Sequence, residues 1–113
     1  GRTPDQRVVE GIGRLVAQLS TLRQMSLSVA GMLSAGKVPE VEAALVKDLG
    51  TNWEQALPSR ARELAPEYCD DPKALSAFEE ILDHATLIAP KLTIQGGTRE
   101  ILRGIIARGL GLR

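Results

Sequence analysis

The spacing of apolar residues in the first third of the chain constrains the fold more than any other feature. Over residues 4–35 they recur mostly every three or four positions, with one longer step of seven. Residues three and four apart share one face of an α-helix, so this spacing predicts a long amphipathic helix. The residues of this apolar seam are Val8, Ile12, Leu15, Leu19, Leu22, Val29 and Leu33.

Further apolar residues lie beside this seam and widen it, namely Val9, Val16 and Met32. Ile105 and Ile106 occupy adjacent positions on a helix expected near the end of the chain. One small core cannot cover both flanks of both helices, and contiguous apolar patches tend to become interfaces. We therefore expect self-association through the first or the last helix, with two-fold symmetric contacts.

The ends of the first helix carry recognisable signals. Thr3 can cap it and Pro4 suits its first turn. Gly36 follows the last apolar position, and glycine often ends a helix in a left-handed conformation.

The same apolar spacing predicts three more helices, over residues 40–64, 72–89 and 98–110. Pro58 interrupts the second pattern, which predicts a kink or a break near residues 54–58. We expect a loop over 66–71, with Asp71 as the cap of the third helix and Pro72 in its first turn.

The third helix should end before Pro90, because the residue preceding a proline disfavours helical geometry. Residues 91–97 are then expected to be extended or irregular, and Thr98 to cap the last helix. With only 3% aromatic residues and little β-branched alternation, the chain is predicted to be all-α, an up-and-down four-helix bundle with an aliphatic core.

Charge and cysteine content exclude several classes of function. Lys plus Arg and Asp plus Glu are both 14, so the formal net charge is zero, which argues against nucleic-acid binding and a polybasic membrane anchor. A single cysteine, Cys69, excludes an internal disulfide framework. No apolar run is long enough to span a membrane and no signal peptide is visible, so we expect a cytoplasmic protein.

The glycine pair Gly96-Gly97 before Thr98 is one candidate binding site. Glycines let a ligand approach the backbone closely, and the N-terminus of a helix favours an anion. The alternative is a flexible turn with Thr98 as an ordinary cap, and spacing alone favours this simpler interpretation.

Other chemically interesting residues are interpreted as surface. His84 has only Glu80 nearby at metal-ligand spacing, and Cys69 has no base near it in sequence. Adjacent carboxylates on a helix point in different directions, which makes Glu79-Glu80 a poor acid–base couple. The same surface interpretation is given to Asp70-Asp71, and the basic stripe Arg99, Arg103 and Arg108 is expected to make solvated contacts or intersubunit ion pairs.

The last stretch of the chain, LTIQGGTREILRGIIARGLGLR, resembles the C-terminal signature of the acyl-CoA dehydrogenases. The signature begins with a glycine pair, Thr, a polar pair and Ile, with an Arg two residues later. It ends with Ile-Ala-Arg-x-Leu-Gly. Upstream, LRQMSLSVAGMLSAGKVPEVEAALVKDLGTNWEQ is similar to the same domain, with its Ala-Gly-Lys turn and its Glu-Ala-x-x-x-Lys pattern. The resemblance therefore extends over most of the chain.

The resemblance implies the C-terminal helical domain of a longer, usually tetrameric, FAD-dependent enzyme. Such enzymes remove the α-proton of an acyl-CoA with a carboxylate and pass the β-hydride to the flavin. Residues 1–113 would be an incomplete C-terminal domain without the N-terminal and middle domains, inactive and colourless alone. The residues that the resemblance assigns to cofactor binding are Gly97, Thr98 and Glu100.

The sequence also departs from the family pattern. Gly96 stands where one branch of the family carries its catalytic Glu, so this site supplies no base. The base would come from an upstream helix, as in other branches, or the chain would belong to a non-catalytic partner subunit. Ala65-Pro66 replaces a common Gly-Pro, and Pro58 is also atypical.

We therefore expect this domain to close the flavin and acyl pockets of its parent and to build an oligomer, a homo-oligomer or a heteromer. The parent's partners would be an acyl-CoA substrate and an electron-transfer acceptor. The alternative is a stand-alone helical interaction module without flavin chemistry. The length of the native open reading frame distinguishes the two.

Overall fold

The computed structural model describes residues 5–94 and 97–112, which form four α-helices and, within these ranges, no strand. The helices are α1 (Gln6–Ser34), α2 (Glu40–Tyr68), α3 (Pro72–Ile94) and α4 (Arg99–Gly109). The predicted all-α class with four helices is confirmed.

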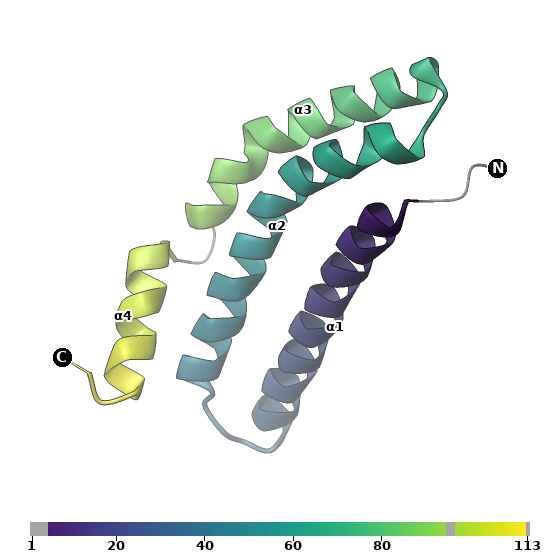
Figure 1. The fold of residues 1–113 in the computed structure, drawn as a ribbon. Coiled ribbons are helices and arrows are strands. Elements are labelled where there is room, and N and C mark those ends of the chain that lie inside the picture. The colour runs from purple at the N-terminus through teal and green to yellow at the C-terminus, as the bar shows by residue number, and fades with distance from the viewer. Residues whose placement is uncertain (1–4, 95–96, 113) are drawn as a thin grey trace.

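Helix α2 is the common packing partner of the other three helices. Helix α1 lies antiparallel to it, α3 runs back along its second half, and α4 continues beside its first half (Figure 1). The molecule measures 51 × 26 × 26 Å and has a radius of gyration of 17.6 Å, whereas a compact domain of this length has about 13 Å. The helices therefore form an elongated assembly around α2.

Glycines end the first and last helices as C-terminal caps. At the end of α1, Gly36 has a φ of 78°, and Lys37 N–H donates to the carbonyl of Met32 at 3.0 Å. This pattern satisfies carbonyls that would otherwise lack a partner, and it confirms the expected left-handed Gly36. Gly111 ends α4 in the same way, with a φ of 77°.

The start of α1 differs from the expectation. Thr3 and Pro4 lie outside the described residues, and the helix begins at Gln6. Asp5 is its N-cap, because its carboxylate accepts a hydrogen bond from the backbone N–H of Arg7 at 3.2 Å.

Helix α2 is longer than predicted and is not broken at Pro58. It is continuous through Pro58 and Pro66 to Tyr68, so a break near residues 54–58 was wrong, and the expected loop is present only over residues 69–71. The other expected outcome, a kink, agrees with Figure 1, where α2 bends between its two halves. Pro58 is buried, and the packing of α2 against its neighbours outweighs the lost backbone hydrogen bond.

Helix α3 begins as predicted but ends later. Asp71 accepts a hydrogen bond from Lys73 N–H at 3.0 Å, and Pro72 is the first helical residue. The helix then continues through Pro90 to Ile94, so the expected end before Pro90 and the irregular segment from Lys91 were wrong over residues 91–94.

The core is small and lies along α2. The buried apolar residues are Val8, Ala44, Leu82 and Leu102, one from each helix. On α1 the less exposed positions include Val8, Leu15 and Leu22, whereas Ile12 and Leu19 of the predicted seam are 45% and 50% exposed.

Much apolar surface is left uncovered. The accessible surface is 8153 Å², against about 6,000 Å² for a compact monomer of this size. Val9 and Val16 are exposed, as the width of the seam predicted, while Met32 is half-buried. On α4, Ile105 and Ile106 are half-buried and Ile101 is exposed, as is Leu110, the residue that follows the helix.

Candidate functional site

The N-terminal turn of α4 carries the glycine–threonine pair identified in the sequence. Gly97 has a φ of 119°, a backbone conformation that L side chains rarely adopt. Thr98 is the N-cap, as predicted, and its Oγ1 accepts from the N–H of Ile101 at 3.4 Å. Glu100 is exposed in the first turn, and Gly96 lies outside the described residues. The described part of the site is thus a capped helix start with a hydroxyl and a carboxylate beside it.

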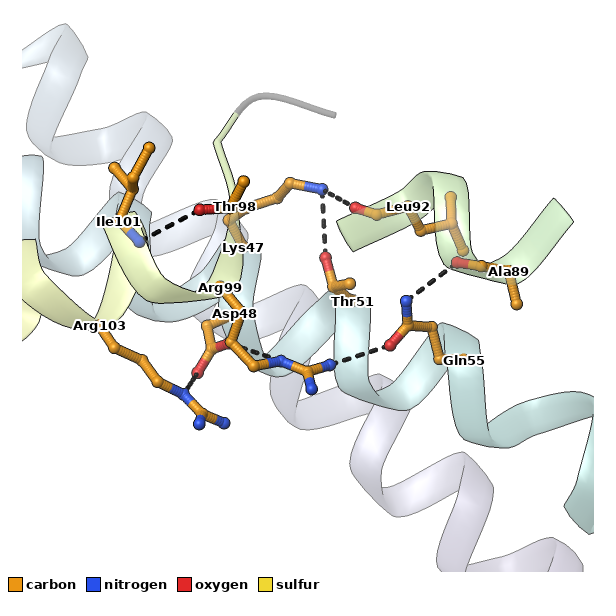
Figure 2. A network of polar contacts seen from close by, with 10 residues as sticks. All are labelled: Lys47, Asp48, Thr51, Gln55, Ala89, Leu92, Thr98, Arg99, Ile101 and Arg103. Carbon is orange, nitrogen blue, oxygen red and sulfur yellow. Dashed lines mark hydrogen bonds and ion pairs between the residues drawn. The ribbon is translucent and has the colours of Figure 1, made fainter. Parts of the chain in front are cut away.

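A buried carboxylate of α2 holds α4 through two arginines (Figure 2). The side chain of Asp48 is only 11% exposed, and its Oδ2 lies 3.5 Å from Nε of Arg103. Its Oδ1 lies 3.8 Å from Nε of Arg99, a buried nitrogen that makes an ion pair but no hydrogen bond among the described residues. Arg99 and Arg103 are therefore partners of α2 within one chain, which corrects their interpretation as a stripe of solvated or intersubunit contacts.

The same face of α2 reaches the last turns of α3. Lys47 Nζ donates to the carbonyl of Leu92 and to Thr51 Oγ1, both at 3.1 Å. Gln55 Nε2 donates to the carbonyl of Ala89 at 2.9 Å, and its Oε1 accepts from Arg99 Nη2 at 2.9 Å. Figure 2 shows how these side chains line one side of α2. We call Lys47, Asp48, Thr51 and Gln55 the α2 polar row.

Sequence reasoning missed the α2 polar row as a functional group of residues. Lys47 was noted only as part of a family pattern. The available signal was the spacing of Asp48, Thr51 and Gln55 by three and four residues, which places three polar side chains on one helical face. Thr51 and Asp48 are both buried, and buried polar groups need partners.

The remaining sequence candidates are not brought together. His84 is exposed on α3, and no group of three metal-ligating side chains occurs in residues 5–94 and 97–112. Cys69 is a half-buried thiol that donates to the carbonyl of Asp71 at 3.6 Å. Glu79 and Glu80 are exposed, as expected for a solvated pair.

One hollow lies away from the N-terminus of α4. It is a groove of about 570 Å³ between α1 and α2, and its walls include Leu15, Leu22, Leu49 and Trp53. Trp53 Nε1 is buried without a hydrogen-bond partner among the described residues. Gly97, Thr98 and Glu100 do not line this groove, so the two features are separate sites on the molecule. Among the described residues, no helix is long and apolar enough to cross a bilayer.

Comparison with known families identifies the domain. Residues 3–111 match the family model described as acyl-CoA dehydrogenase, C-terminal domain. Searches of curated proteins and of solved structures gave no match. The match spans all four helices, including the Gly97–Thr98 start of α4. The chain therefore belongs to the acyl-CoA dehydrogenase C-terminal domain family.

Proposed function

We propose that this chain is the C-terminal domain of an FAD-dependent, acyl-CoA dehydrogenase-like oxidoreductase. Its full-length parent would dehydrogenate an acyl-CoA thioester between the α and β carbons. The observation that carries the proposal is the signature Gly97–Thr98 pair, which forms the start of a helix held by the α2 polar row. Residues 1–113 would then be an incomplete domain that acts together with the rest of its parent.

Gly97, Thr98 and Glu100 are the residues proposed to contact the flavin cofactor. A β-carbon on Gly97 would lie 3.5 Å from Leu102 Cδ2, which is an ordinary contact, so it is the positive φ that favours glycine here. The Thr98 hydroxyl can still donate while it accepts from Ile101. Glu100 can accept from a ribose or ribityl hydroxyl. These groups suit a polar cofactor, and FAD, when bound, would accept the hydride.

No catalytic base is assigned to this chain. Glycine at position 96 cannot abstract a proton, and the carboxylate of Asp48 is buried in its contact with Arg99 and Arg103. In the proposed parent, the base lies on another segment or on another subunit. The role of this chain would be to position α4 and to close the flavin and acyl pockets.

The uncovered apolar surface supports a role in assembly. Val9, Val16 and Leu19 are 54%, 56% and 50% exposed along one side of α1. Over its 29 residues, α1 carries only four charged side chains, Arg7, Glu10, Arg14 and Arg23. Exposed apolar side chains that adjoin one another mark a surface that another chain covers. We propose that α1 contributes to a homo-oligomer or to a heteromer, and a cytoplasmic location stays a prediction.

The same surface favours the alternative function, a helical interaction module or a non-catalytic partner subunit. The experiment that separates the two is to isolate the polypeptide carrying this domain from its native source and record its mass and absorbance spectrum. A polypeptide several times longer than 113 residues with flavin absorption supports the oxidoreductase. A colourless polypeptide of about this length would contradict it and favour the interaction module.

A further inference from the structure

The end of α3 is capped by side chains of another helix. The last carbonyls of a helix have no intrahelical N–H partner. Leu92 lies in the last turn of α3, and its carbonyl oxygen accepts from Lys47 Nζ of α2 at 3.1 Å. The ammonium also brings positive charge to the negative end of the helix dipole. Lys47 therefore fixes the end of α3 against α2.

Gln55 joins the end of α3 to the start of α4 through one amide group. Its Nε2 donates to the carbonyl of Ala89 in α3 at 2.9 Å. Its Oε1 accepts from Nη2 of Arg99, the first residue of α4, also at 2.9 Å. Since a primary amide is planar, its two ends cannot move independently. The first turn of α4 is thereby placed relative to the last turns of α3.

Direct packing between α3 and α4 does little to set this relation. Helices α3 and α4 each pack extensively on α2, but among the described residues they do not pack extensively on each other. In the described part of the chain, the polar partners of Asp48 are the arginines of α4, and those of Lys47 lie on α3 and on its own helix. The α2 polar row thus contacts both sides of the connection between α3 and α4.

We propose that Lys47 and Gln55 are positioning residues, which fix the Gly97–Glu100 turn relative to the end of α3. The part of the proposal that concerns flavin rests on the proposed function given above. Neither residue is proposed to touch the cofactor or the substrate. Each acts through Arg99 or through the α3 carbonyls, and both are half-buried, so their loss loosens the turn without removing the apolar core.

Backbone hydrogen exchange in the 113-residue chain tests the positioning role. Lys47→Met removes the ammonium and keeps most of the stem, and Gln55→Leu removes both the acceptor for Arg99 and the donor to Ala89. The double variant should exchange the Ile101 and Leu102 amides about tenfold faster, with little change in α1, because only a local opening becomes easier. The single variant Lys47→Arg keeps a cation at this position, so its Ile101 and Leu102 amides should exchange as slowly as those of the wild-type chain.

Lys91→Met is the matched control. Lys91 also lies in the last turn of α3, but it is exposed, and its side chain makes no hydrogen bond or ion pair with the described residues. This variant removes the same charge from the same helix end and should leave the exchange of α4 unchanged. Equal effects of Lys47→Met and Lys91→Met, or a uniform acceleration over the whole chain, would overturn the positioning role.

A second measurement addresses the flavin and distinguishes the two proposals. In the full-length parent, Lys47→Met should weaken FAD binding by about tenfold if the turn opens to that extent, and Lys91→Met should not. Changed exchange with unchanged FAD affinity would overturn the link between the turn and the flavin. A parent that binds no flavin would contradict the proposed function, while the exchange result would still decide the positioning role.

Discussion

Gly109, the last residue of α4, packs directly on Val41, near the start of α2. A β-carbon at position 109 would overlap Cγ2 of Val41 and lie 3.2 Å from its Cβ. Val41 is β-branched and its χ1 is stiff, so it cannot turn away easily. The close approach of α4 to α2 at this end therefore requires glycine.

The first prediction follows from this contact. Gly109→Ala should destabilise the chain by about 1–2 kcal/mol, because the added methyl group forces α4 away from α2. Urea unfolding followed by circular dichroism measures the change. Gly104→Ala is the control, since nothing lies within 4 Å of a β-carbon there, and it should stabilise α4 by up to about 1 kcal/mol. Equal effects of the two substitutions would contradict the close approach.

Substitutions of two adjacent valines of α1 should differ sharply in their effect on the free energy of unfolding. Val8 is fully buried and Val9 is 54% exposed. Val8→Ala should cost about 2 kcal/mol through lost burial and the cavity left behind. Val9→Ala should change the free energy of unfolding by less than about 0.5 kcal/mol when measured on the monomer. A large cost for both would mean that α1 presents a different face to α2.

Removing the charge of Asp48 should loosen α4. We expect Asp48→Asn to lower the free energy of unfolding by about 1 kcal/mol, a modest value because Arg99 and Arg103 are partly exposed and screened by solvent. The loss should shrink in 1 M salt, where the Debye length falls to about 3 Å. Thermal unfolding at low and high salt, combined with a double-mutant cycle with Arg103→Gln, measures this coupling.

Glu63→Gln is the control for that experiment. Glu63 pairs with Arg60 at 4.0 Å, but both side chains are well exposed, at 69% and 59%. Glu63→Gln should leave the free energy of unfolding unchanged within about 0.5 kcal/mol. If Asp48→Asn behaves like Glu63→Gln at low salt, the burial of Asp48 contributes nothing to holding α4.

Self-association through α1 is tested by sedimentation at micromolar concentration. Val16→Gln should weaken a two-fold symmetric dimer roughly a hundredfold, because it removes two valines from the interface and each is worth about 1.5 kcal/mol. The unfolding of the monomer should be unaffected, since Val16 is 56% exposed. Ser76→Gln, at an exposed position of α3, should have no effect on association. A wild-type chain that sediments as a clean monomer would refute the interface.

Apolar periodicity predicted the number, order and approximate positions of the helices, but proline misled the prediction of their ends. The sequence places Pro58, Pro66 and Pro90 inside apolar patterns, and the local cost of proline argued for breaks there. That cost is about 3 kcal/mol or more for a proline inside a helix, and tertiary packing along α2 offsets it. In α1, the seam was wide enough that the sequence could not say which edge faces α2, and Ile12 and Leu19 fell on the exposed edge.

The candidate site was predictable only in part. Thr98 as a cap and the glycine before it are local signals, and both were found. Asp48 and Gln55 act on residues more than 40 positions away in α4, at Arg99 and Arg103. No local pattern states that α4 returns to the first half of α2, so the partners of these polar residues became visible only with the fold.

The central place of α2 has a consequence for cooperativity. Among the described residues, α1, α3 and α4 each pack mainly on α2 and little on one another. The unfolding of one of these three helices therefore leaves the contacts of the other two with α2 in place. Such an arrangement unfolds in separable steps, and α4 is the shortest of the helices and should open first. A single melting temperature would then report the unfolding of α2 with α1 and α3, and it would not reveal that α4 unfolds earlier.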